Sequence, residues 1–253
     1  MNKATLLKLS KNFVMNKATS KLALGSANFG LDYGLANKSG KVSVNKLTEI
    51  LFFAREAGID VVDTAQAYGD SEARIGSLCD DAQFNIVTKI GVGSEKEYLD
   101  RNVISSVEQS CRRLNQSRLY GVMLHRPEVL LTSNGSAVVR QLQTLKEQGI
   151  ISKVGISIYS PEILGAISKL FRLDIVQAPF NIFDQRLITK KYYQILKSKK
   201  IEIHVRSIFL QGLLLNKKTF ELNNQIKLKK KINFLHKFGK LNNMKVIDLC
   251  MTF

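Results

Sequence analysis

Short apolar runs alternate along the chain with longer segments whose apolar positions recur at helical spacing. Runs such as "NIVTKI" and "IVQAPF" are apolar on both faces, which is typical of strands buried on both sides. The predicted strands are Lys21–Leu24, Asp60–Asp63, Asn85–Ile90, Gly121–His125, Lys153–Tyr159, Ile175–Pro179 and Glu202–Ile208. The predicted helices are Val44–Ala57, Ser71–Cys79, Leu99–Leu114, Ser136–Gln148, Pro161–Leu170 and Thr189–Lys199.

The regular succession of strand, helix and strand predicts parallel strands joined by crossover helices. Local signals agree, because Ser160 and Pro161 form a helix N-cap followed by proline at the first helical position. Seven such units without a domain-sized linker favour an α/β fold of the (β/α)8 TIM-barrel type over a doubly wound sheet. Only seven strands are found and the chain ends within a predicted helix, "MKVIDLCMTF". We therefore expect the barrel to lack strand 8 and its helix.

The first residues contain a short repeat, since "MNKAT" occurs at Met1–Thr5 and again at Met15–Thr19. We expect residues 1–20 to form an N-terminal extension and residues 21–253 to form the barrel. Either Met15 is the natural start, or residues 1–14 are a local duplication without a function.

Composition narrows the class of protein. The chain has 253 residues, of which 45% are hydrophobic, and this is enough for a sizeable core. No apolar stretch is long enough to cross a membrane, and no secretory signal is recognised at the N-terminus. Cys79, Cys111 and Cys250 are widely spaced and form no CxxC motif, so we interpret them as reduced thiols of a cytoplasmic protein. No cluster has metal-ligand spacing, and we expect no metal site.

The chain is strongly basic, with a formal net charge of +17. Much of the excess lies in Asn216–Lys245, where nine lysines accompany only Glu221. We interpret this segment as a solvated helix and loop, because aromatic residues are not interleaved with the lysines as in a base-stacking surface. We therefore expect neither nucleic acid nor a membrane as a partner, and the oligomeric state stays open.

Four chemically active residues follow neighbouring predicted strands. Asp63 ends the second strand and Tyr68 follows in its loop, Lys89 lies near the end of the third strand, and His125 ends the fourth. In a parallel barrel the carboxyl ends of the strands share one mouth, so we expect these side chains to meet. A lysine ammonium beside a phenol lowers the pKa of the phenol, and a carboxylate keeps a buried ammonium charged. A histidine can donate to an oxygen on which negative charge develops. The set suits proton transfer to a carbonyl.

These residues resemble the Asp-Tyr-Lys-His tetrad of the aldo-keto reductase superfamily, most specifically in "DTAQAYGDSE". The segments "LALGSANFGLDYGLAN", "VTKIG", "LHRP", "VGIS", "VQAPFNIFDQR" and "VRSIFLQGLLL" follow in the family's order, so the resemblance extends from about Lys21 to Phe253. The last segments are most similar to bacterial NADP-dependent members. The resemblance implies a barrel that reduces an aldehyde or ketone with NADPH, a sugar-derived carbonyl being one candidate substrate.

The resemblance also implies a role for each residue. Tyr68 would be the general acid, Lys89 would tune it, Asp63 would hold Lys89, and His125 would orient the carbonyl. The residues implied in cofactor binding are Gly25, Ser26 and Ala27 at the nicotinamide ribose, Ser157 and Gln177 at the carboxamide, Arg206 on strand 7, and Ser207, Gln211, Gly212 and Leu213 in the loop near the pyrophosphate. Two positions depart from the family, because Ile158 replaces a common asparagine and Arg206 replaces an aromatic residue that often stacks on the nicotinamide.

Two other functions stay open. In the family, the segment after strand 8 holds the adenosine end of the cofactor. Since we expect this barrel to lack strand 8, the alternative function is a truncated, non-catalytic or regulatory barrel that binds NADPH weakly or not at all. The third reading is nucleic-acid binding through the lysine-rich segment. Among further residues, Glu72 is expected to complement a helix dipole, and His204 and His236 are expected to be structural.

Overall fold

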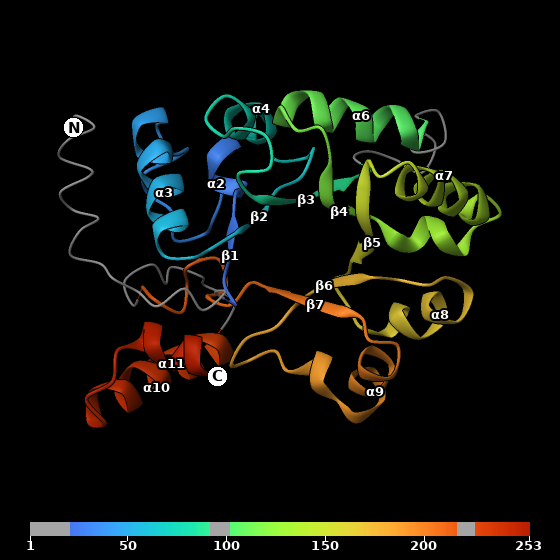
Figure 1. The fold of residues 1–253 in the computed structure, drawn as a ribbon. Coiled ribbons are helices and arrows are strands. Elements are labelled where there is room, and N and C mark those ends of the chain that lie inside the picture. The colour runs from blue at the N-terminus through green and yellow to red at the C-terminus, as the bar shows by residue number, and fades with distance from the viewer. Residues whose placement is uncertain (1–20, 92–101, 217–225) are drawn as a thin grey trace. The chain divides into compact units, whose positions relative to one another are not determined.

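The computed structural model describes residues 21–91, 102–216 and 226–253, and it shows an α/β fold in which strands alternate with helices (Figure 1). The seven strands follow one another in the sheet in chain order, from β1 to β7. The pairs β1–β2, β2–β3, β5–β6 and β6–β7 are parallel, as the crossover pattern predicted. The predicted extension, with its candidate start at Met15, lies outside the described residues.

The strands agree with the pattern of apolar runs. They are β1 (Ala23–Gly25), β2 (Val61–Asp63), β3 (Asn85–Ile90), β4 (Leu119–Leu124), β5 (Ile151–Ser157), β6 (Ile175–Pro179) and β7 (Glu202–Arg206). The bounds of β3 and β6 are those predicted, and the others differ by a few residues. Strand β7 ends at Arg206 because the next residue, Ser207, has a φ of +61° and leaves the extended conformation.

The helices are α2 (Ala27–Gly30), α3 (Val44–Glu56), α4 (Ser71–Gly76), α6 (Val103–Leu114), α7 (Gly135–Glu147), α8 (Glu162–Leu170), α9 (Lys190–Ser198), α10 (Ile226–Leu241) and α11 (Val246–Thr252). Short 3-10 turns are η1 (Pro127–Leu131) and η2 (Arg186–Ile188). The prediction that Ser160 caps α8 was wrong. Pro161 occupies the cap position, and no side chain caps this helix.

The chain divides into two compact units, and each unit is made of segments that alternate along the chain with segments of the other. Unit 1 takes the residues up to Leu31, Lys41–Val122 and Leu142–Lys153, and unit 2 takes Asp32–Gly40, Met123–Gln141 and Val154–Phe253. The boundaries fall inside β4 and β5.

Unit 1 is built on β1, β2 and β3. In register, Gly25 lies beside Asp63, and Asp63 lies beside Val87. Helix α4 packs against α6 (Figure 1), and Gly76 makes this possible because a Cβ there would lie 2.2 Å from the carbonyl oxygen of Arg113. The core of this unit consists of buried apolar residues from its strands and its helices, such as Leu47, Leu51, Val62, Ile75, Ile86, Val87, Val107 and Leu114.

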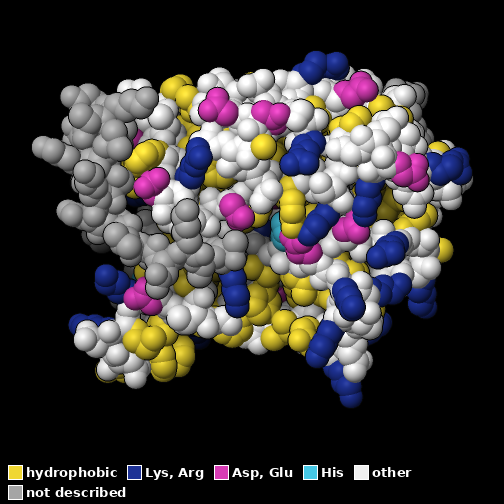
Figure 2. All heavy atoms as spheres, viewed as in Figure 1, with side chains coloured by type: hydrophobic (Ala, Val, Ile, Leu, Met, Phe, Trp, Pro, Cys, Tyr) yellow, Lys and Arg dark blue, Asp and Glu magenta, His cyan; other side chains and the backbone are white. Residues whose placement is uncertain are grey.

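Unit 2 contains β6, β7 and the helices α8 to α11. A second apolar cluster joins Leu213 and Leu214 of the loop after β7 to Ile232, Leu235 and Cys250 of α10 and α11. The lysine-rich segment is helical where it is described, and the lysines of α10 are exposed. Figure 2 shows a further group of basic side chains over α9, where the exposed lysines are Lys190, Lys191, Lys197, Lys199 and Lys200.

Parallel strands in chain order, each followed by a helix or turn, form the architecture of a (β/α)8 barrel. The predicted fold class is confirmed. The residues that the structure describes provide seven of its strands and no eighth.

Candidate active site

A buried ion pair at the end of β2 and β3 is the centre of the candidate site. The ammonium of Lys89 lies 2.7 Å from Oδ1 and 2.8 Å from Oδ2 of Asp63. It also donates to the carbonyl oxygen of Thr64 at 2.9 Å. The Lys89 side chain is only 1% exposed, and an ammonium at such a site requires an anionic partner to stay charged. The predicted pairing of Asp63 with Lys89 is present.

The turn after β2 places Tyr68 close to this pair. The Nζ atom of Lys89 lies 5.1 Å from the centroid of the Tyr68 ring, a distance at which an ammonium and an aromatic ring attract each other. The turn itself is held by hydrogen bonds from the amide of Tyr68 to the carbonyl oxygen of Ala65 and from the amide of Ser71 to that of Tyr68.

Two glycines allow the backbone to pass close to this turn. A Cβ on Gly30 would lie 1.8 Å from the carbonyl oxygen of Tyr68, and a Cβ on Gly69 would lie 2.4 Å from the carbonyl oxygen of Gly30. Gly69 also has a φ of +57°, a conformation that glycine adopts without strain. The end of α2 therefore lies close against the turn that carries Tyr68.

The residues predicted to lie at the nicotinamide ribose are at the end of β1 and directly after it. Gly25 is exposed, Ala27 is half-buried, and Ser26 is fully buried. The Ser71 hydroxyl donates to the carbonyl oxygen of Ser26 and lies 2.9 Å from the Ser26 hydroxyl. Because the Ser26 side chain is engaged in this way, a ligand at this strand end would meet backbone rather than the hydroxyl.

Glu72 has a role that the sequence did not indicate. Its carboxylate is 2% exposed, accepts from the hydroxyl of Thr88 at 2.6 Å and pairs with Arg113 at 2.7 Å. Glu72 lies in the first turn of α4 as expected, but its partners come from β3 and α6. The contacts of Glu72 join three elements of unit 1. Glu72 and Arg113 are 41 positions apart in the sequence, so the pattern of neighbouring residues could not predict their pairing.

In unit 2, three polar residues lie side by side across three strands. Ser157 of β5 is in register with Gln177 of β6, and Gln177 is in register with His204 of β7. The Ser157 hydroxyl lies 3.4 Å from Oε1 of Gln177, and both side chains are buried. His204 bonds through Nε2 to Glu202 at 2.7 Å, while its buried Nδ1 has no partner among the described residues.

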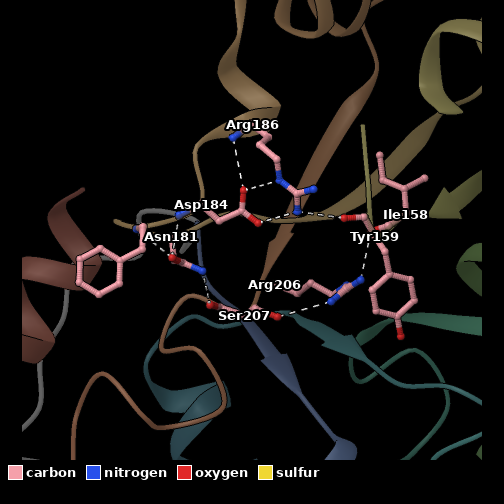
Figure 3. Close-up of polar contacts among 8 residues, drawn as sticks. Ile158, Tyr159, Asn181, Asp184, Arg186, Arg206 and Ser207 are labelled. Carbon is pink, nitrogen blue, oxygen red and sulfur yellow. Dashed lines mark hydrogen bonds and ion pairs between the residues drawn. The ribbon is translucent and has the colours of Figure 1, made fainter. Parts of the chain in front are cut away.

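Arg206 ends β7 and stacks on Tyr159, as Figure 3 shows. The guanidinium carbon lies 4.5 Å from the centroid of the Tyr159 ring, and Nη2 donates to the carbonyl oxygen of Ile158 at 3.0 Å. The carbonyl oxygen of Ser207 accepts from Nδ2 of Asn181 at 3.1 Å. Arg206 therefore stacks on a ring of the chain itself.

The loop after β7 has an unusual backbone. Leu210, Gln211 and Gly212 have consecutive positive φ values of 49°, 54° and 84°, a conformation that is uncommon for non-glycine residues. A Cβ on Gly212 would lie 2.9 Å from the Cβ of Ala36. Gln211 is exposed, but the side chain of Leu213 is buried in the apolar cluster of unit 2, so its contact with a ligand would be through the backbone.

Of the predicted tetrad, unit 1 brings together Asp63, Lys89 and Tyr68. His125 directly follows β4, is half-buried and belongs to unit 2. Within the ranges that the structure describes, no group of three histidine, cysteine, aspartate or glutamate residues is arranged to hold a metal ion. None of the helices in those ranges has the length and apolar character needed to cross a membrane.

The aldo/keto reductase family model matches residues 21–253. An oxidoreductase of Bacillus subtilis without an assigned reaction, YqkF, is 26% identical over 219 residues, which cover 82% of this chain and 70% of that protein. The D-arabinose 1-dehydrogenase of Saccharomyces cerevisiae is 33% identical over 122 residues, which cover 45% of this chain and 36% of the yeast protein. The matched part of the chain thus spans one third to somewhat over two thirds of these relatives.

Solved structures agree with this assignment. The crystal structure of an aldo-keto reductase homologue from Pseudomonas aeruginosa superposes with a TM-score of 0.63 at 28% identity, covering 81% of this chain and 80% of that one. A Bombyx mori aldo-keto reductase in complex with NADP has the same fold, with a TM-score of 0.62 at 16% identity over 90% of this chain and 74% of that one. Because the family model matches residues 21–253, a range that includes every residue that the structure describes, the protein belongs to the aldo/keto reductase family of nicotinamide-dependent oxidoreductases.

Proposed function

We propose that this protein reduces an aldehyde or ketone with NADPH and that Tyr68 is the general acid. The observation that carries the proposal is the buried ammonium of Lys89, which is paired with Asp63 and lies 5.1 Å from the centroid of the Tyr68 ring. A positive charge held at that distance in a poorly solvated site stabilises the phenolate that forms when the phenol gives up its proton.

Each of the four side chains of the tetrad has a distinct task in this proposal. Tyr68 donates the proton of its hydroxyl to the carbonyl oxygen, and Lys89 stabilises the negative charge left on the phenol. Asp63 keeps Lys89 charged and fixes the position of its ammonium. His125 donates a hydrogen bond to the carbonyl oxygen and so orients the substrate. When bound, NADPH supplies the hydride.

Ser157 at the end of β5 and its neighbour Gln177 within β6 are suited to a nicotinamide. Ser157 and Gln177 form a buried pair whose hydroxyl and amide can each donate and accept, which matches the carboxamide of the nicotinamide ring. The backbone of Gly25 and Ala27, and the loop with Gln211 and Gly212, would hold the ribose and the pyrophosphate. The choice of NADPH over NADH is part of the proposal.

The test is NADPH oxidation with a panel of aldehydes and ketones, followed by absorbance, for the wild type and Tyr68→Phe. Removing a general acid lowers the rate by about 10²–10⁴-fold, and we expect a loss of this size in kcat. The matched control is Tyr33→Phe, which removes the hydroxyl of a tyrosine that is 39% exposed and should retain the wild-type rate. Unchanged turnover by Tyr68→Phe would exclude the assigned acid.

The second candidate is a barrel that has kept these residues but binds the cofactor weakly or not at all. It is favoured by one observation, the stacking of Arg206 on Tyr159 at the position where the family often presents an aromatic ring to the nicotinamide. Titration of NADPH, followed by nicotinamide fluorescence, separates the two candidates. Micromolar affinity supports the reductase, and no saturation at millimolar NADPH supports the non-catalytic barrel.

A further inference from the structure

Helix α9 and the two residues after it present a basic surface to solvent (Figure 2). We define the α9 surface by its exposed cations, which are Lys190, Lys191, Lys197, Lys199 and Lys200. No aspartate or glutamate occurs between positions 185 and 201, and none of the five ammonium groups forms an ion pair with a residue that the structure describes. The positive charge of this surface is therefore not neutralised by the described carboxylates.

The stability of α9 does not account for these charges. Lys190 and Lys191 are the first two residues of the helix, and its first turn contains no acidic residue. The N-terminal end of a helix carries a partial positive charge, so lysines there are unfavourable. Cations gathered on one surface also repel one another. A partner that carries several negative charges would relieve both effects.

Tyrosine rings lie among the lysines of α9. The Nζ atom of Lys191 lies 5.5 Å from the centroid of the Tyr192 ring, and that of Lys197 lies 6.0 Å from the centroid of the Tyr193 ring. The Tyr193 side chain is exposed. Lysines interleaved with exposed aromatic rings are typical of surfaces on which bases stack. The expectation of no nucleic-acid partner rested on Asn216–Lys245, which is a different segment.

The lining of this face suits phosphate groups. An open groove with a volume of about 1020 Å³ lies on it, and the described residues that line it are Lys190, Lys191, Gln194, Ile195, Lys197 and Ser198. Lysine ammonium groups bind phosphates as point charges. An anionic membrane would instead call for a helix with a broad exposed apolar face. In α9, all of which is described, Tyr193 is the only large apolar side chain that is exposed.

We propose that the α9 surface binds single-stranded nucleic acid, with its lysines on the phosphate backbone and a base stacked on the Tyr193 ring. Binding of this kind tolerates any sequence and has a Kd of about 1–100 µM at physiological salt. The inference goes beyond the proposed reductase function and does not depend on it, because α9 contributes no residue to the candidate active site.

The first experiment measures fluorescence anisotropy of a labelled single strand of about 12 nucleotides, within the usual site size, against the full chain at several salt concentrations. The variant Lys190→Gln/Lys191→Gln/Lys197→Gln should bind at least about 10-fold more weakly. Its slope of log affinity against log salt should be shallower by about 2, because each phosphate contact to a single strand contributes about 0.7. An unchanged affinity and slope would overturn the inference.

The matched control removes the same charge from another helix. Lys227→Gln/Lys230→Gln/Lys237→Gln changes three exposed lysines of α10 and should keep the affinity and salt slope of the wild type. Equal weakening in the two triple variants would overturn the inference, because the strand would then respond to net charge and not to the α9 surface. All of these positions are exposed, and thermal unfolding checks that both variants remain folded.

The second experiment separates stacking from charge. Tyr193→Leu should weaken binding of the single strand by at least about 5-fold, the lower end of what one stacked base contributes. Its affinity for inorganic polyphosphate, measured by competition with the labelled strand, should stay at the wild-type value because polyphosphate has no bases. Equal changes for both ligands would overturn the stacking of a base on Tyr193. Sedimentation of the wild type with phosphatidylserine vesicles, without binding to the strand, would overturn the inference by assigning the surface to a membrane.

Discussion

The ammonium of Lys89 and the carboxylate of Asp63 are 2.7 Å apart at a position where Lys89 is almost fully buried. Removing one partner of such a pair leaves an uncompensated charge and costs about 3–5 kcal/mol. We expect Lys89→Met to lower the free energy of unfolding by this amount in urea titrations. Lys41→Met is the matched control, because Lys41 and Asp70 form an exposed pair at 3.1 Å and such pairs contribute about 0–1 kcal/mol. Equal losses in the two variants would contradict this prediction.

The pair formed by Glu72 and Arg113 should be strongly coupled in stability. Glu72 is buried, whereas the Arg113 side chain is 39% exposed, so solvent screens part of the interaction. A double-mutant cycle with Glu72→Gln and Arg113→Met should give a coupling energy of about 1–3 kcal/mol, measured by chemical denaturation. If the two substitutions have additive effects on the free energy of unfolding, the hydrogen bond from Thr88 alone satisfies the Glu72 carboxylate.

Two glycines in unit 2 should respond to alanine in opposite directions. At Gly155 in β5, a Cβ would lie 2.5 Å from the carbonyl oxygen of Ile175, so Gly155→Ala must push β5 away from β6. At Gly165 in α8, no atom lies within 4 Å of the added Cβ. We expect Gly165→Ala to stabilise the protein by about 0.5–1 kcal/mol, because alanine is the better helix former. Gly155→Ala should destabilise it by about 1–3 kcal/mol, and thermal unfolding of both variants provides the measurement.

The cysteines should make stability fall at high pH. Burial raises the pKa of Cys79 and of Cys111 to about 11. Both thiols are protonated in both states below their ordinary pKa of about 8.5–9. Above it the unfolded chain loses these protons while the folded chain keeps them, so the free energy of unfolding falls as the pH rises toward 11.

The measurement is urea unfolding at pH 8 and pH 10.5 for the wild type and the Cys79→Ala/Cys111→Ala variant. The wild type should lose more stability between the two pH values than the variant, whose lysines titrate identically. Identical losses would show that the two thiols do not contribute. In the folded wild type, both thiols should also react slowly with a disulfide reagent at neutral pH, because the thiolate is the reactive form.

The fold was predictable because it depends on local pattern. Buried parallel strands appear in the sequence as short apolar runs, and Asn85–Ile90 and Ile175–Pro179 were located to the residue. The predicted and observed bounds of a strand differ where backbone geometry overrides the hydrophobic pattern. Ile208 was assigned to β7 on hydrophobicity, but the positive φ of Ser207 ends that strand at Arg206.

The site was predictable where its residues follow consecutive strands. Asp63 ends β2 and Lys89 is the penultimate residue of the neighbouring parallel strand β3. In register Asp63 lies beside Val87, and the long Lys89 side chain reaches the carboxylate from two residues further along. Glu72 and Arg206 could not be assigned in this way, since their partners, Arg113 and Tyr159, come from other elements.

The two units are completed at different times during synthesis on the ribosome, because their segments alternate along the chain. Every residue of unit 1 has been translated once Lys153 is added, while β6, β7 and the helices from α8 onward are still missing. Domains generally fold from the N-terminus as the chain emerges. The nascent chain can therefore pair Lys89 with Asp63 before Arg206 exists, whereas β5 is still incomplete and lacks its partner strand β6 until more of the polypeptide is made.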